Sequence, residues 1–126
     1  TGFRGIPGDV TPPSRFVRAA FYQTTAPQYD TGFETVKQAF QILNNFDIPV
    51  GIEHSPSSGP LPENVPSATQ WTTSSDLKAL RFYYRTAWNS TIRCIDLKSI
   101  RFDKVGFTAA PLDKVQEQPV EFIKVK

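Results

Sequence analysis

The sequence has little of several residue types on which common functions depend. Its 126 residues include one cysteine, one histidine and no methionine. A single cysteine excludes an internal disulfide framework and a cysteine-rich zinc site. No apolar run approaches membrane-spanning length. The 14 basic residues are scattered and the net charge is only +2, whereas nucleic-acid binding needs a basic patch or stripe. We therefore expect no metal, cofactor, nucleic acid or membrane as a partner.

The absence of methionine extends to position 1, which is threonine. We therefore expect this chain to be a processed piece or a fragment of a longer protein. Its length corresponds to one domain, which could bury roughly two-thirds of its unfolded surface. Ten Phe, four Tyr and two Trp supply material for a core.

The stretch from Gly5 to Tyr22 contains turn signals followed by a marked helix start. Thr11 can cap a helix whose first position is Pro12, where no N–H donor is needed. We predict a helix over about residues 12–22. Its apolar residues on one side are expected to be buried: Phe16, Val17, Ala20 and Phe21.

Arg15 is unexpected in the first turn of that helix, because the positive end of the helix dipole disfavours a cation there. We expect either a carboxylate such as Asp9 or a functional site to hold it. Arg18 lies three residues further on, so the two arginines could form an anion site or simply be solvated.

A second helix is predicted over about residues 33–44, followed by a change of composition. An apolar stripe with helical spacing supports this helix: Val36, Ala39, Phe40 and Leu43. Residues 55–66 then contain four prolines and three serines. They could form a polyproline-type recognition segment, but a rigid surface loop is the favoured interpretation.

After residue 66 the apolar period changes from that of a helix to that of a strand. Strands are predicted over residues 69–75, 80–88 and 91–97, with shorter candidates at 100–102 and 119–126. Helices followed by strands predict an α+β fold with an antiparallel sheet. Alternation around Tyr83 and Tyr84 puts aromatic rings on both faces of this sheet, which favours packing against more protein.

Three residues are candidates for other chemistry. Cys94 lies within a strand pattern, so we interpret it as a buried structural thiol and not as a reactive one. His54 has no second imidazole or cysteine cluster with which to bind a metal, and a Cys94–His54 nucleophile pair has no local support. Thr1 could act as a terminal nucleophile with its own amine as base, although an arbitrary chain start is favoured.

Three segments resemble the choloylglycine hydrolase family, which comprises penicillin V acylases and conjugated bile salt hydrolases. The first is GIPGDVTPPSRFVRAAF, where Ile6 stands in place of the usual Leu and Ser14-Arg15-Phe16 matches the family motif. The others are QILNNFDIPVG and TQWTTSSDLKALRFYYRTAWNSTIRCIDL. The resemblance covers most of residues 2–103. The Ala-Trp-Asn after the long strand is most similar to the Gram-negative branch.

The resemblance implies an N-terminal nucleophile αββα sandwich, of which residues 1–126 would be the C-terminal portion of a single domain. It implies hydrolysis of a linear amide by an N-terminal cysteine that lies in a portion outside this chain. Arg15 would lie near the cysteine sulfur, as a fixed and permanently charged donor. Cys94 is internal and Thr1 is not at the matching position, so neither replaces the nucleophile.

From this resemblance we expect the chain alone to be inactive, with the N-terminal portion of the same enzyme as its partner. The substrate would be penicillin V, an acyl-homoserine lactone or a conjugated bile salt, with acylase activity favoured in the Gram-negative branch. A periplasmic location would go with that branch, and a cytoplasmic one otherwise. Homo-oligomerisation, a non-catalytic α+β binding module and a Thr1 hydrolase stay open as alternatives.

Overall fold

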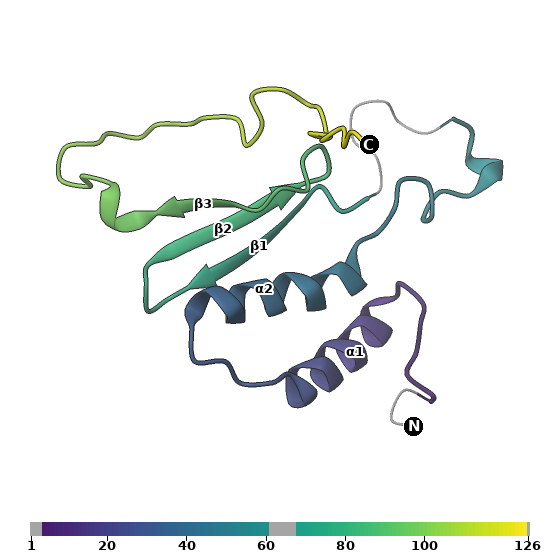
Figure 1. The fold of residues 1–126 in the computed structure, drawn as a ribbon. Coiled ribbons are helices and arrows are strands. Elements are labelled where there is room, and N and C mark those ends of the chain that lie inside the picture. Colours follow the sequence, from purple (N-terminus) through teal and green to yellow (C-terminus); the bar gives the residue numbers. More distant parts are fainter. Residues whose placement is uncertain (1–3, 61–67, 126) are drawn as a thin grey trace. The chain divides into compact units, whose positions relative to one another are not determined.

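The computed structural model describes residues 4–60 and 68–125, and its chain divides into two compact units. The first unit, Thr1–Thr69, contains the helices, and the second, Gln70–Lys126, contains the sheet (Figure 1). The predicted α+β class with an antiparallel sheet is confirmed. Among the described residues no helix is both long and apolar enough to cross a membrane.

Helix α1 (Pro12–Thr25) begins where the prolines predict and continues three residues beyond the expected end. The prediction of its buried face is wrong. Phe16 is 73% exposed and Val17 is 46% exposed, whereas Ser14 and Arg18 are buried. The polar side of the helix is buried because it faces the preceding loop, where the partners of its side chains lie.

Helix α2 (Gly32–Leu43) follows its sequence pattern closely. The Thr31 hydroxyl accepts a hydrogen bond from the Glu34 amide (3.2 Å), which caps the first turn. Val36 and Phe40 are buried as predicted. The chain continues in a 3₁₀ turn, η1 (Asn44–Phe46), whose Phe46 ring meets the Tyr22 ring of α1 edge to face.

After η1, the described residues up to 60 form a loop that contains a short 3₁₀ turn, η2 (Pro56–Ser58). The chain returns to Ile48, whose amide donates to the Thr69 hydroxyl (2.9 Å). The proline-rich segment lies partly outside the described residues, since 61–67 are not described. Its described part, 55–60, contains the turn η2, and residues 55 and 57–60 are exposed, in agreement with the surface-loop interpretation.

The second unit contains three antiparallel strands in the order β1-β2-β3. Their bounds are Trp71–Asp76 for β1, Arg81–Thr86 for β2 and Arg93–Asp96 for β3. All three predicted main strands are confirmed: β2 and β3 are slightly shorter than predicted, and β1 starts two residues later and ends one residue later. The register pairs Thr73 with Tyr84, and Tyr84 with Arg93, so these three residues lie on one face of the sheet.

That face is largely open in this chain. Trp71 is 60% and Ile95 is 40% exposed on it, while Tyr83 is buried on the opposite face. Aromatic residues therefore lie on both faces, as the alternation predicted. Exposed apolar residues of this size are typical of a surface that other protein covers.

The two shorter strand candidates are wrong within the described residues. After β3 the chain forms a 3₁₀ turn, η3 (Leu97–Ser99), and residues 100–125 contain no strand. They run back along the sheet as an extended segment (Figure 1). Alternation alone does not make a strand, because a strand also needs a neighbouring edge with which to form its ladder.

Candidate functional site

The loop before α1 is held by the Asp9 carboxylate. Its Oδ1 accepts hydrogen bonds from the Thr11 amide (2.8 Å) and the Thr11 hydroxyl, and its Oδ2 accepts one from the Ser14 hydroxyl (2.7 Å). Thr11 is at the N-cap position, but its hydroxyl donates to Asp9 and does not cap the helix. These hydrogen bonds, those of the two hydroxyls first, lower the pKa of Asp9 to about 2.

Arg18 fixes the same loop from the helix side. It is only 7% exposed. Its Nη1 donates to the carbonyl oxygens of Pro7 (2.9 Å) and Asp9 (2.7 Å), and its guanidinium lies over the Phe46 ring, 5.4 Å from the centroid. Arg18 is therefore neither solvated nor half of an anion site. It is an anchor that attaches the loop to the helix.

Arg15 is arranged differently. It is half-buried. Within residues 4–60 and 68–125 its guanidinium makes no hydrogen bond or ion pair, although its amide donates to Thr11 O (3.0 Å) as part of the helix. The carboxylate of Asp9 is committed to Thr11 and Ser14, so it does not hold Arg15. Of the two explanations that the sequence offers for this cation, the functional site is the one that stays open.

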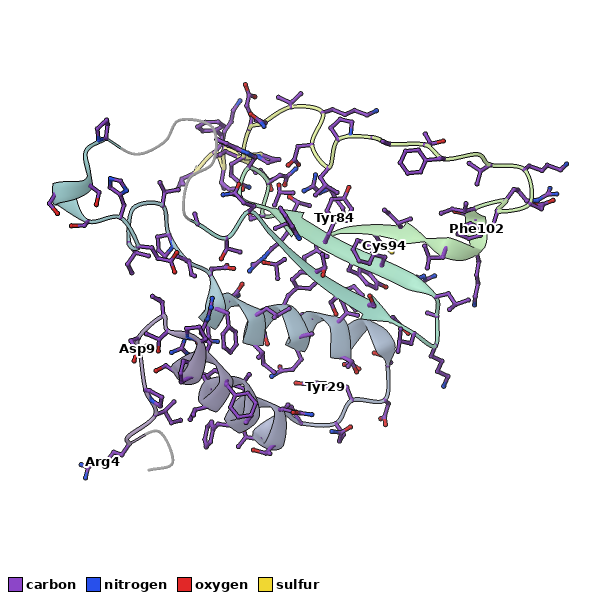
Figure 2. All side chains as sticks on the ribbon, turned by 180° about the vertical axis from the view of Figure 1, so that it is seen from behind. Arg4, Asp9, Tyr29, Tyr84, Cys94 and Phe102 are labelled. Atoms are coloured by element: carbon purple, nitrogen blue, oxygen red, sulfur yellow. The ribbon has the colours of Figure 1, made fainter. Side chains whose placement is uncertain are left out.

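The remaining candidates do not assemble into a second site. Cys94 is exposed, so the interpretation as a buried thiol is wrong (Figure 2). The reason is that β3 is a four-residue edge strand, with a neighbouring strand on one side only. His54 is half-buried, and its Nε2 hydrogen-bonds to Gly59 O at 2.6 Å. Thr1 lies outside the described residues, and those that are described contain no cluster of metal-ligating side chains.

A cluster around Arg93 in the second unit is absent from the sequence predictions. Arg93 forms an ion pair with Asp113, twenty residues further along the chain. Asp113 lies in a segment without helix or strand period, so no local signal connects it with Arg93. The only hint is the placement of Tyr84 and Arg93 as cross-strand partners, which follows once the register is known.

Comparisons with known proteins agree with the resemblance. Residues 1–109 match the family model described as linear amide C–N hydrolases, choloylglycine hydrolase family. This chain belongs to that family. It is 34% identical over 103 residues to a bile salt hydrolase/transferase of Clostridium perfringens, covering 82% of this chain and 30% of the relative. It is 32% identical over 120 residues to a penicillin V acylase of Pectobacterium atrosepticum, covering 86% and 30%.

Solved structures give the same result for this family member. A mutant conjugated bile acid hydrolase of Clostridium perfringens superposes with a TM-score of 0.66 at 27% identity, over 98% of this chain and 35% of that one. Penicillin V acylase from Agrobacterium tumefaciens superposes with a TM-score of 0.63 at 27% identity, over 79% and 30%. The expected fold, a portion of an N-terminal nucleophile αββα sandwich, is thereby confirmed. The chain spans about a third of the length of these relatives.

Proposed function

We propose that residues 1–126 supply the C-terminal part of a linear-amide hydrolase whose cysteine nucleophile lies in a portion outside this chain. The proposal rests on the environment of Arg15. It is a half-buried arginine with no hydrogen bond or ion pair among the described residues, at the end of a loop that Asp9 and Arg18 hold rigidly. Such a cation, kept without a partner of its own, is suited to a group that the rest of the enzyme supplies.

The chemistry follows from the groups involved. The cysteine thiolate attacks the amide carbonyl, and the amide nitrogen leaves as an amine after it gains the proton that the terminal amine took from the thiol. Water then hydrolyses the thioester and releases the acid. Arg15 contributes a permanent positive charge beside the sulfur, which favours the thiolate and orients it. Arg15 forms no covalent bond and transfers no proton in this reaction.

The substrate class proposed is a linear amide: penicillin V, an acyl-homoserine lactone or a conjugated bile salt. The relatives are named for bile salts and for penicillin V. Penicillin V is proposed first, since the Ala-Trp-Asn of residues 87–89 resembles the Gram-negative branch. Rates of hydrolysis of each of the three amides by the protein that carries both portions would rank them.

Intact mass and a denaturing gel test the proposal first. A second polypeptide that begins with cysteine, isolated together with this one, would support it. A lone 14.1 kDa species that is monomeric and folds cooperatively would contradict it, because the piece would then stand alone. Activity that is lost on Thr1→Ala would instead make residue 1 the nucleophile.

Arg15→Ala tests the role of the arginine in the protein that carries both portions. We expect turnover to fall by about a hundredfold or more, as when one oriented charge or donor is removed from an active site, with the fold intact by circular dichroism. Arg101→Ala is the matched control. The Arg101 side chain is 66% exposed and, within the described part of the chain, pairs with its neighbour Asp103, so turnover should not change. Near-normal turnover of Arg15→Ala would remove Arg15 from the site.

A further inference from the structure

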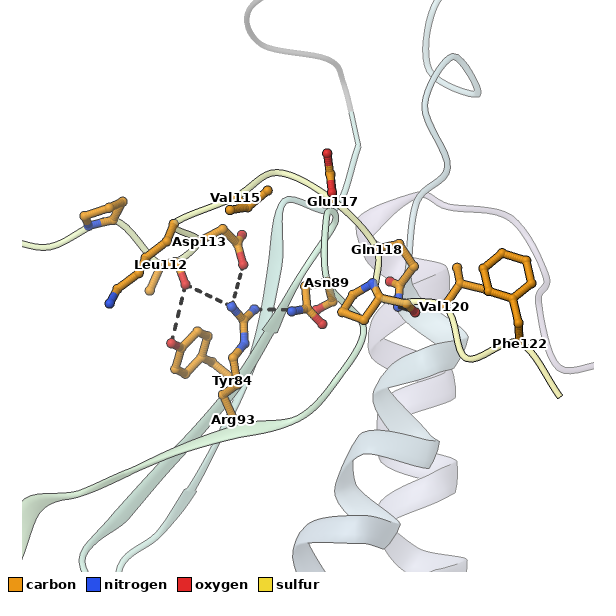
Figure 3. A pocket seen from close by; sticks show the side chains of 13 residues that line it. Tyr84, Asn89, Arg93, Leu112, Asp113, Val115, Glu117, Gln118, Val120 and Phe122 are labelled. Atoms are coloured by element: carbon orange, nitrogen blue, oxygen red, sulfur yellow. Dashed lines mark hydrogen bonds and ion pairs between the residues drawn. The ribbon is translucent and has the colours of Figure 1, made fainter.

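The segment 111–120 lies against the sheet without forming a strand. Figure 3 shows it passing over the end of β2 and β3, where the Arg93 guanidinium meets it. Arg93 Nη1 donates to the Leu112 carbonyl (2.9 Å) and to Asp113 Oδ1. The Asp113 side chain is only 7% exposed, so this ion pair is shielded from water on the acidic side.

The sheet holds the arginine in place independently of that segment. Arg93 Nη2 donates to the Thr86 hydroxyl (3.2 Å) and to the Asn89 carbonyl (3.5 Å). Its guanidinium lies over the Tyr84 ring, 4.5 Å from the centroid. Because β2 and the turn after it fix the guanidinium, its remaining donors point in a set direction. The guanidinium of Arg93 therefore presents preoriented donors to segment 111–120, and a carboxylate and a carbonyl are suitable acceptors for them.

The environment of Asp113 agrees with a pair that is formed in the folded chain. The Thr86 side chain donates a hydrogen bond to this carboxylate, and Arg93 adds a hydrogen bond and its charge. Together these lower the pKa of Asp113, against the effect of burial, which raises it.

A second attachment lies further along the same segment. The Ser90 amide donates to Gln118 Oε1 (2.8 Å). Between the two attachments the segment is exposed, as at Val115, which is 61% exposed. An open cleft of about 880 Å³ is lined by residues of the sheet and of the segment. The segment also lies beyond residues 1–109, which match the family model.

We propose that residues 111–120 form a strap that opens and closes over this cleft as one unit, with the Arg93–Asp113 pair as its latch. The strap has no ladder of backbone hydrogen bonds to the sheet, so its opening needs few contacts to break. The sheet keeps its own register when the strap is open, because the β1-β2-β3 pairing does not involve residues 111–120. The strap thus controls access to the open face at Tyr84 and Arg93.

Limited trypsin digestion of the protein as isolated tests this proposal, because Lys114 lies within the strap. The rate of cleavage after Lys114 is followed by mass and divided by the rate after Lys104, which is exposed outside the strap. Asp113→Asn should raise this ratio about tenfold, since a hydrogen bond between charged groups becomes a weaker one. Arg93→Ala should raise it at least as much.

A second ion pair on the same sheet provides the matched control. Arg81 and Asp96 pair across β2 and β3 at 3.5 Å with 48% and 41% of their side chains exposed. The strand register places them on the sheet face opposite to Tyr84 and Arg93. Asp96→Asn should leave the ratio unchanged. Equal cleavage of Asp113→Asn and the parent protein at Lys114 would overturn the proposal. So would a rise at Lys104 of the same size, because the strap would then not open separately from the rest of its unit.

Discussion

Two arginines, one in each unit, hold irregular segments in place, and they do so with different partners. Arg18 donates to two backbone carbonyls of the loop before α1 and lies over Phe46. Arg93 donates to one carbonyl of the strap, to a carboxylate and to the sheet, and lies over Tyr84. The same guanidinium geometry serves both, because a planar group with five donors can satisfy several acceptors and stack on a ring.

The two arginines differ in the acceptors that would lose a hydrogen-bond donor if the arginine were replaced. The partners of Arg18 are neutral, and the arginine is almost fully buried. Those of Arg93 include a charge, and its own side chain is 24% exposed. We therefore expect Arg18 to act mainly on the stability of its unit, and Arg93 on the position of one segment.

Replacement of Arg18 gives the largest expected effect of this comparison. Arg18→Ala should lower the free energy of opening of α1 by about 2–3 kcal/mol, because two buried carbonyls lose a charged donor. Native-state hydrogen exchange of the α1 amides measures this. Arg15→Ala, on the same helix but without a partner in the described residues, should change it by less than about 0.5 kcal/mol. Equal effects of the two changes would break the distinction between anchor and site residue.

A salt series tests the same difference between Arg18 and Arg93, and its expected effect is of intermediate size. Raising NaCl should increase strap opening about two- to threefold, because ions screen the partly exposed Arg93–Asp113 pair. The exchange of α1 amides should change less, since Arg18 donates to neutral carbonyls. Trypsin ratios at Lys114 and exchange rates of α1, measured in the same salt series, check both expectations. A larger response of α1 than of the strap would contradict them.

The acid response of Asp9 is the smallest expected effect. Its pKa is lowered to about 2 from an ordinary value of 3.8. The folded state therefore gains stability from this carboxylate above the ordinary pKa, and that gain is lost as the pH falls through about 2. The Thr11 amide resonance should titrate with a midpoint near 2, as followed by NMR. A midpoint near 3.8 would show that the Thr11 and Ser14 hydrogen bonds do not form in solution.

Much of the local structure could be predicted from the sequence. Pro12 and Pro13 mark the start of α1, and the spacing of Val36 and Phe40 predicts which side of α2 is buried. Alternation and turn residues place the three strands of the sheet. These features depend on neighbours within a few residues, so their signals are local. The family motif likewise singled out Arg15 before any geometry was known.

Other features depend on contacts between residues that are distant in the sequence. For these features the sequence led to a wrong prediction or to none. Cys94 has strand neighbours but lies on an edge strand, so it is exposed. Residues 119–125 alternate but form no ladder with an edge strand of the sheet, so they are not a strand. The buried side of α1 is polar, because Asp9 and the loop carbonyls lie there.

The sequence by itself determined the two helices, the three main strands, their order and the family, because periodicity, turn residues and motifs depend on neighbouring positions in the chain. Tertiary structure alone decided the roles of three similar arginines. Arg18 is buried and donates to backbone carbonyls, Arg93 forms an ion pair with Asp113, and the Arg15 guanidinium has no partner in the described residues. The physical reason is that the role of a guanidinium depends on which acceptors the fold brings within about 3 Å of it, and these come from other parts of the chain.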